Sequence, residues 1–272
     1  MPRPTVPSAR AARRRAAREA GAAPLDATGL RRRVATARLT GPDGRTDRAR
    51  RLLLAWLDAG FARGLTAPVA VDALASGAAA EQIAQIVRAQ TMQAPPPEVA
   101  HAACAQGCAF CCILDGPDGG TITENEARRM HAALAPLAGR PDGRAWHPAA
   151  CPALDPDSRT CRAYEARPSL CRSFFSSDAE ACRANVDGEA VAGAGLLGSH
   201  FDQLDVMALA RAALGGPARA RSYALSELAA AAVEGRDLDA SLAAARQSPG
   251  TLDAARRGLA AAAGAATAAG DG

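Results

Sequence analysis

Apolar residues recur at intervals of three and four positions along most of the chain, and β-branched residues are scarce. This spacing is typical of helices with one buried face. The first clear stripe is Leu53, Trp56 and Leu57, with Asp47 before it as a side-chain cap and Gly60 after it as a stop. We therefore predict a helix between Asp47 and Gly60.

A second apolar stripe follows at Ile83, Ile86 and Val87. Ser76 can accept hydrogen bonds from the first free N–H groups of this helix, and the run Pro95–Pro97 cannot continue it. The sequence thus predicts a second helix before the proline run, with all three apolar residues on its buried face.

The centre of the chain carries turn and capping signals. The segment Asp115–Gly120 consists of Asp, Gly and Pro and predicts a loop. Thr123 and Glu126 then have the spacing of a capping box, which opens a helix that we expect to end at Gly139.

Two short extended segments are expected next. Cys151–Leu154 and Arg159–Tyr164 flank the turn-forming residues Asp155–Ser158, a pattern that favours a short hairpin. Pro168 suits the first turn of a short helix that carries Cys171.

Beyond about Gly188 the helical spacing returns, interrupted at Gly215–Pro217 and at Pro249–Gly250. The apolar residues of the predicted helices are Phe201, Leu204 and Met207, then Leu225 and Leu228, then Leu238 and Leu242. The predicted fold class is mainly α, with an irregular, cysteine-rich, metal-centred domain that contains a short hairpin and is flanked by helices.

Charge divides the chain unevenly. All 32 basic residues are Arg, and residues 1–50 carry a balance of +9 while the whole chain carries +4. A disordered basic tail is favoured over a targeting peptide or an arm for nucleic acid or an anionic surface, so nucleic-acid binding is not expected. No apolar run of about 20 uncharged residues is present to span a membrane.

Five regions are therefore expected along the chain. They are a basic disordered extension (1–47), a helical segment (48–94), a cysteine-cluster metal-binding domain (95–187), a second helical segment (188–262) and a frayed tail (263–272).

The cysteines are the main chemical signal. They are Cys104, Cys108, Cys111, Cys112, Cys151, Cys161, Cys171 and Cys182. Thiols gathered in this way, with no recognisable secretion signal, favour metal ligation over disulfides, and a reducing cytoplasm is the expected compartment. We predict that these eight residues supply the metal ligands.

The spacing of the cysteines bears on the metal. Zinc bound by four sulfurs is usually held by two close pairs, and only Cys108 and Cys111 are spaced as such a pair. An iron–sulfur cluster tolerates wider spacing, so a cluster is predicted ahead of zinc. Eight thiols could fill two sites of four ligands, or one site with spare thiols, and one of the adjacent Cys111 and Cys112 is a candidate for a structural role.

Local geometry and charge add to this picture. If the first four cysteines lay on a helix, their thiols would share one face of it, although a loop could also fold around an ion. Arg162, Arg167 and Arg172 are close in sequence to Cys161 and Cys171, and they could offset the charge of thiolates.

Other candidate residues are weaker. His101 and His147 are near the cysteines, but a lone histidine at the edge of a segment is more simply interpreted as a surface residue. Glu165 and Asp178 could serve acid–base chemistry, although helix capping explains Asp178 equally well.

The spacing of Cys104, Cys108 and Cys111, with Phe110 before the third cysteine, resembles the motif of radical S-adenosylmethionine enzymes. Those enzymes place the motif in a barrel of alternating strands and helices, and this chain has no such series of strand-like runs. We interpret the match as a coincidence.

The cysteine region as a whole resembles the YkgJ-like CxxCxxCC cysteine-cluster family, whose members are described as zinc- or iron-chelating domains. The resemblance rests on Cys108–Cys112, Cys151–Leu154, Cys161–Pro168 and Cys171–Phe174. It implies an iron–sulfur cluster or zinc as the cofactor. The sequence departs from the family pattern at Cys104, which three residues rather than two separate from the next cysteine.

Two function classes follow. The first is a metal-binding protein with a redox or structural role, which includes docking of a protein partner. The second is an enzyme, since flagellin lysine methylases resemble the same family; it would be a protein lysine N-methylase-like or oxidoreductase member with a cleft lined by Trp146, Tyr164, Phe174 and Phe175. We favour the first, because a compact core around the metal explains these aromatic residues with fewer assumptions.

Overall fold

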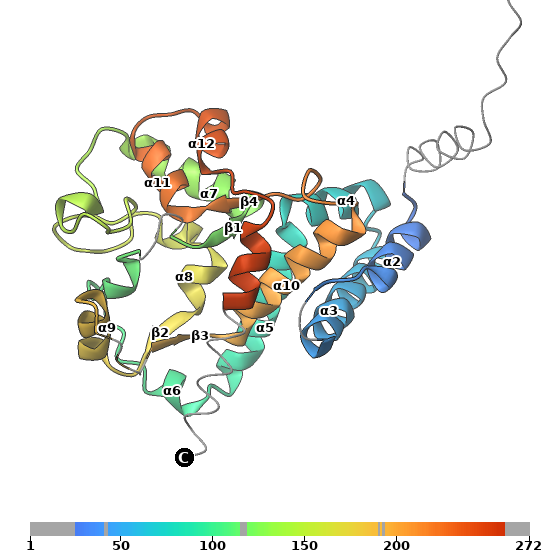
Figure 1. The fold of residues 1–272 in the computed structure, drawn as a ribbon, viewed down its shortest axis with the longest axis horizontal. Helices are drawn as coiled ribbons and strands as arrows, with labels where there is room; N and C mark the ends of the chain where they lie inside the picture. The colour runs from blue at the N-terminus through green and yellow to red at the C-terminus, as the bar shows by residue number, and fades with distance from the viewer. Residues whose placement is uncertain (1–24, 41–42, 115–118, 190, 192–193, 259–272) are drawn as a thin grey trace, which may run out of the picture.

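The computed structural model describes residues 25–40, 43–114, 119–189, 191 and 194–258. Its helices form two groups, each around its own apolar core (Figure 1). The predicted mainly α fold is confirmed, since the strands in the described residues are short and antiparallel.

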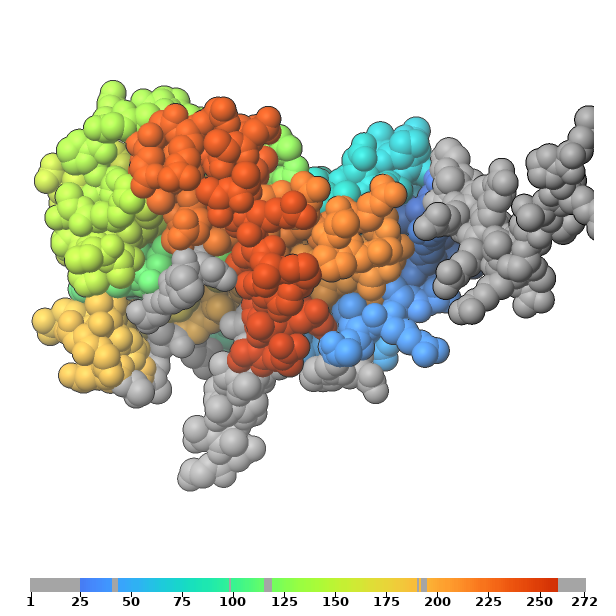
Figure 2. Space-filling view, turned by 45° about the horizontal axis from the view of Figure 1, so that its top comes forward, coloured from blue at the N-terminus to red at the C-terminus, as the bar shows by residue number. Residues whose placement is uncertain are grey.

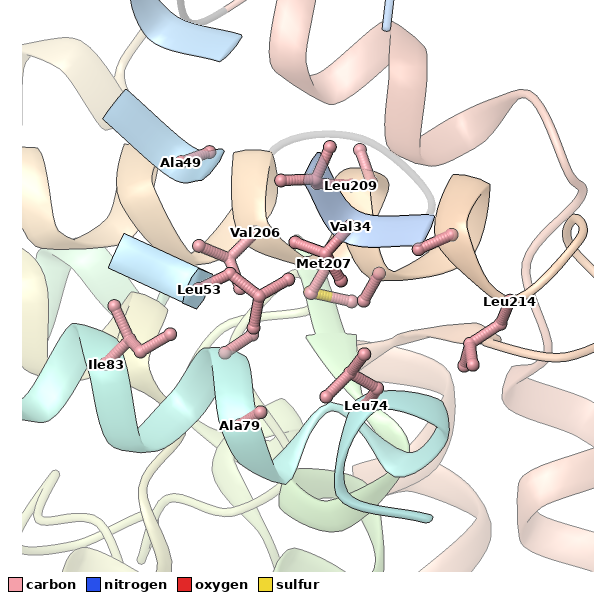
Figure 3. Packing of buried hydrophobic residues seen from close by; sticks show 14 of the residues in the cluster. Val34, Ala49, Leu53, Leu74, Ala79, Ile83, Val206, Met207, Leu209 and Leu214 are labelled. Atoms are coloured by element: carbon pink, nitrogen blue, oxygen red, sulfur yellow. The ribbon is translucent and has the colours of Figure 1, made fainter. Parts of the chain in front are cut away.

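The first group joins helices from the two ends of the described chain. It consists of α2 (Ala27–Thr36), α3 (Asp43–Ala62), α4 (Ala67–Ser76), α5 (Ala78–Gln93) and α10 (Gly198–Ala213). Leu53, Ile83 and Leu209 come from three of these helices and meet in one core (Figure 3). Leu252, from a helical stretch at 251–258, closes the same core.

The second group covers the cysteine region. It consists of α7 (Glu124–Leu134), α11 (Leu225–Val233) and α12 (Leu238–Ala245), which pack on a two-stranded ladder of β1 (Thr121–Thr123) and β4 (Ser222–Ala224). Ile122 and Tyr223 are opposite each other in this ladder and both are buried in the second core.

Short elements connect the cysteines to these cores. They are α6 (Pro97–Ala100), η1 (Phe110–Cys112), η2 (Ala135–Leu137), η3 (Gly143–Ala145), η4 (Tyr164–Ala166), α8 (Ser169–Ser173), β2 (Phe174–Ser176), α9 (Ala179–Val186) and β3 (Ala194–Leu196). The strands β2 and β3 pair antiparallel, with Phe175 opposite Gly195.

Two local signals are confirmed. The Glu126 N–H donates to Thr123 Oγ1 at 3.0 Å and the Thr123 N–H donates to Glu126 Oε2 at 2.9 Å, which is a complete capping box. Leu154 and Cys161 form an antiparallel bridge, as the predicted hairpin requires. The predicted loop residues 115–118 lie outside the described residues.

The boundaries of several helices differ from the predictions. α3 begins at Asp43 and continues through Gly60, where a Cβ would meet Leu65 Cδ2 at 2.7 Å. α7 ends at Leu134 rather than at Gly139, because Pro136 in the next turn lacks the N–H that would continue the helix.

The predicted face of α5 is partly wrong. Ile83 and Val87 are buried, whereas Ile86 is 55% exposed. The buried stripe is centred on the small residues Ala79, Ala80 and Ala84, so Ile86 lies beyond its edge. Ser76 ends α4, and Gly77 in the left-handed conformation separates the two helices.

The predicted basic extension is also partly wrong. Leu30 and Val34 of α2 are fully buried in the first core, so this part of residues 1–47 is folded. Residues 1–24 and the predicted frayed tail lie outside the described residues. Apolar positions four residues apart in α2 are sufficient to anchor an arginine-rich helix.

The expected helical segment 188–262 is divided between the two groups. α10 packs against α3 and α5, whereas α11 and α12 pack against α7. The space-filling view shows the same division: the orange stretch that contains α10 lies beside the blue and cyan N-terminal helices, and the red-orange helices lie on the green cysteine region (Figure 2). Within the described residues, no helix is both long and apolar enough to cross a membrane.

A buried histidine in α10 predicts a pH-dependent stability. His200 is 3% exposed, and burial lowers its pKa from 6.5 to about 4. His200 takes up a proton near pH 6.5 in the unfolded chain but only near pH 4 in the folded chain. Its effect on the free energy of unfolding is therefore absent above pH 6.5, and the folded state loses stability as the pH falls from 6.5 towards 4. The expected loss in the free energy of unfolding reaches about 3 kcal/mol.

Urea unfolding at about pH 7.5 and about pH 4.5 measures this dependence. The His200→Gln variant should lose less stability between the two pH values than the natural chain does. Equal losses in the two proteins would contradict the assignment to His200.

Candidate metal centre

The first four cysteines lie on a loop. Gly107 and Ala109 both have positive φ, at 81° and 54°, and only Phe110–Cys112 forms a single helical turn. The helical arrangement considered for these cysteines is therefore wrong, because a left-handed residue interrupts the helix between Cys104 and Cys111.

Backbone hydrogen bonds bring the later cysteines to the end of this loop. The Cys151 N–H donates to the Cys112 carbonyl at 2.7 Å, and the Leu114 N–H donates to the Ala149 carbonyl at 2.9 Å. The Leu154–Cys161 bridge then places Cys161 next to the same backbone. Cys112 and Cys151, which are 39 positions apart in the chain, thus share one site with Cys161.

Glu126 positions the helix that carries Cys171. This carboxylate is 1% exposed, and its Oε1 accepts from the Ser169 N–H at 2.7 Å and from Gln203 Nε2 at 2.9 Å. One buried side chain therefore links α7, α8 and α10. The sequence singled out Glu126 only as part of a capping box.

Five thiols are within electrostatic range of one another; we call them the inner thiol group. They are Cys111, Cys112, Cys151, Cys161 and Cys171. The pKa of Cys112 is raised first by a hydrogen bond with Cys111, and those of Cys151 and Cys171 first by burial; negative charge on the neighbouring cysteines raises all three further. The inner thiol group combines members of both sequence groups.

The other three thiols form the outer thiol group, which consists of Cys104, Cys108 and Cys182. α9, which carries Cys182, packs against η1. Burial raises the pKa of Cys108, and negative charge on Cys182 and on Cys104 raises it further. Negative charge on Cys111 also raises the pKa of Cys108, so the inner and outer thiol groups adjoin each other. The Ser176 N–H donates to Cys104 Sγ at 3.4 Å.

Burial dominates the acid–base behaviour of the inner thiol group. It raises the pKa of Cys151 to about 12, and it raises the pKa of Cys161 and of Cys171 as well. The Cys112 thiol donates a hydrogen bond to Cys111 Sγ, which raises the pKa of Cys112 and lowers that of Cys111. Most of these sulfurs therefore become thiolates only when a cation lies among them.

Arginines contribute part of that positive charge. Arg167, Arg162 and Arg172 all act to lower the pKa of Cys161, and Arg167 acts in the same direction on Cys111 and Cys171. The three arginines that are close to Cys161 in the sequence are therefore also close to it in the fold.

Backbone N–H groups also point at the sulfurs. Those of Phe110, Ala153 and Ala163 each donate to the sulfur of the cysteine two residues before them, and each lowers the pKa of that cysteine. Hydrogen bonds of this kind stabilise a thiolate and orient it as a ligand.

The donor set fits a thiophilic ion, because all eight candidate ligands are sulfurs. Across the described residues, no three Cys, His, Asp or Glu side chains are already close enough together to hold one ion. Ligation would therefore require the thiols of a group to converge by rotation of their side chains.

Two residues that the sequence did not single out lie close to Cys151 and affect it in different ways. A Cβ on Gly143 would clash with the Cys151 carbonyl oxygen, so only glycine fits there. Charge on Asp142 is among the causes that raise the pKa of Cys151. Neither residue has a local sequence signal, because both are eight or more positions away from this cysteine.

The weaker candidates have local roles. His101 Nδ1 is 2.8 Å from the Pro97 carbonyl oxygen, and His147 Nδ1 accepts from the Ala149 N–H at 3.2 Å. Asp178 caps α9 by accepting from the N–H groups of Glu180 and Ala181, which is the alternative that the sequence allowed.

The aromatic residues predicted to line a cleft are spread over different surroundings. Trp146 packs against the second core, whereas Tyr164 is 55% exposed with Arg167 stacked on its ring at 3.7 Å. A cavity of about 750 Å³ has no cysteine in its lining, which includes Val71, Leu214 and Arg219.

Comparison with known proteins agrees with the chemistry of the cysteines. Residues 103–188 match the CxxCxxCC family model, described as "Putative zinc- or iron-chelating domain". No curated protein and no solved structure matches the chain. The match contains all eight cysteines and covers less than half of the chain. The cysteine region, residues 103–188, is therefore similar to the CxxCxxCC family, and this similarity supports metal binding by the cysteines.

Proposed function

We propose that the inner thiol group holds an iron–sulfur cluster and that the protein has a redox or structural role based on it. The observation that carries the proposal is the grouping of five thiols from four separated backbone segments, with three arginines beside them. A cluster accepts ligands from separate segments, whereas structural zinc usually takes close pairs.

The burial of each thiol and the groups that interact with it indicate which cysteines would be the ligands. Cys151, Cys161 and Cys171 come from different segments, and each has a pKa raised first by burial, so they are the best candidates for ligands enclosed by protein. Cys111 is the best fourth ligand, because Cys112 and Arg167 both stabilise its thiolate. Cys112 would then remain a hydrogen-bond donor to it.

The residues around the site would hold and tune such a cluster. The N–H groups of Ala153 and Ala163 would donate to ligand sulfurs, and Arg162, Arg167 and Arg172 would offset their charge. Both interactions favour the reduced form of a cluster. An iron–sulfur cluster bound there would supply one-electron transfer.

Metal analysis of protein purified without oxygen tests this proposal. We expect iron and acid-labile sulfide in equal amounts, with a visible absorption that bleaches in air. Protein purified in air serves as the reference. Zinc in stoichiometric amount without sulfide would show that the sulfur ligands hold zinc instead.

A further inference from the structure

A small cavity lined by arginines lies next to the inner thiol group. Its volume is about 220 Å³. The charged residues that line it are Arg88, Arg129, Arg167, Arg172, Glu81 and Glu165. They come from α5 in the first helix group and from α7, η4 and α8 in the cysteine region, so the cavity is located where the two groups meet.

The negative charge of Glu81 is already neutralised. Gln85 Nε2 donates to its Oε1 at 2.9 Å, Asn125 Nδ2 donates to its Oε2 at 2.6 Å, and Arg129 forms an ion pair with it. This carboxylate is therefore fixed by α5 and α7 and does not balance the other arginines.

The other three arginines have no carboxylate partner among the described residues. Arg88 Nε donates to the Arg172 carbonyl at 2.9 Å, and Arg172 donates to the carbonyls of Arg167, Tyr164 and Glu165. Arg167 Nε is buried and has no hydrogen-bond partner within the described residues. Carbonyl oxygens therefore orient the guanidinium groups of Arg88 and Arg172 without cancelling their charge.

We propose that this cavity binds a small oxyanion, either a phosphate or a carboxylate group of a small ligand. The four arginines exceed the two glutamates by two positive charges. Guanidinium groups match the paired oxygens of phosphate and carboxylate. The volume is below the roughly 300–1,000 Å³ of sites for drug-sized ligands, which limits the ligand to a small one.

Anion binding in this cavity is a separate function from the proposed binding of metal, because Arg88 lies in α5, outside the residues 103–188 that match the family model. A bound anion would lie beside the metal centre. Arg167 lines the cavity, and its positive charge also acts to lower the pKa of three thiols of the inner group.

Titration calorimetry with inorganic phosphate and, separately, with malonate tests the proposal on the metal-loaded full chain at constant sodium chloride. Arg88→Gln removes one of the unpaired charges, and Arg51→Gln removes the same charge from an exposed position on α3. We expect Arg88→Gln to weaken binding about tenfold or more and Arg51→Gln to leave it unchanged.

The two anions distinguish a phosphate site from a carboxylate site. The proposal is overturned if neither anion binds the natural chain, or if the two variants weaken binding equally, which would indicate a net-charge effect. The metal content of each preparation is measured in parallel and should be unchanged by Arg88→Gln; a loss of metal would assign Arg88 to the thiol centre and overturn the proposal.

Discussion

Cys171→Ser is expected to remove the metal from the inner thiol group, whereas Cys182→Ser should leave that metal in place. Cys171 lies on α8 and packs, partly buried, against the second core, and burial is the main cause that raises the pKa of its thiol. A serine hydroxyl there is a poor ligand for zinc or iron, and the remaining thiols would keep their raised pKa values. We expect metal affinity to fall at least about 100-fold, more than the loss typical of changing a residue that only supports a ligand.

The two variants are matched, because each replaces one thiol with a hydroxyl in a different group. Iron, zinc and sulfide are measured in both after anaerobic purification, and thermal unfolding is recorded. Equal loss of metal from the two variants would mean that all the thiols serve one site. No loss from Cys171→Ser would exclude Cys171 as a ligand.

Cys112→Ser completes this series. If Cys112 only donates a hydrogen bond to Cys111, a serine hydroxyl can replace the thiol as a donor, and the metal content should be retained. Loss of metal similar to that in Cys171→Ser would make Cys112 a ligand instead.

Asp205→Ala is expected to destabilise the fold by about 3–5 kcal/mol, because it removes the carboxylate that pairs with both buried Arg256 and partly buried Arg45. Asp205 is 4% exposed in α10, and its two carboxylate oxygens accept from Arg45 Nε and Arg256 Nε, both at 2.7 Å. Arg256 is itself only 6% exposed. The interaction joins α3, α10 and the helical stretch 251–258.

Asp58→Ala is the matched control. It breaks an ion pair with Arg31 in which both side chains are about half exposed, so the expected loss of stability is much smaller. Urea unfolding gives the free energy of unfolding for each variant. If the two losses agree within about 1 kcal/mol, the buried pair does not stabilise the fold as we infer.

The double variant Asp205→Leu with Arg256→Met provides a second test if Asp205→Ala does not fold. Replacing both partners with apolar side chains removes the unpaired buried charge on Arg256. We expect this chain to recover part of the lost stability. No recovery would indicate that the loss has another cause.

Residues that are close in sequence determined much of what could be predicted. Thr123 and Glu126 interact over three positions, and the turn after Leu154 closes over a few residues, so both structures follow from local chemistry. The sulfur-only donor set, which predicts a thiophilic metal, is likewise a property of composition.

Burial of helix faces was predictable only in part. Periodicity placed Ile83 and Val87 in the core but also Ile86, which is exposed. The pattern did not include the alanines of α5, although they form much of its contact surface. The basic composition of α2 likewise predicts a disordered tail, although Leu30 and Val34 are buried.

Only the tertiary structure decided how the cysteines are grouped. The sequence by itself determined that eight thiols occur in two clusters, but the fold places Cys111 and Cys112 with the later cysteines and Cys182 with Cys104 and Cys108. It also placed α10 with the N-terminal helices and packed α5 against α8, which brings Arg88 to the Arg172 carbonyl beside Cys171. These arrangements depend on shape complementarity between segments far apart in the chain, and that is not encoded in the spacing of any one segment.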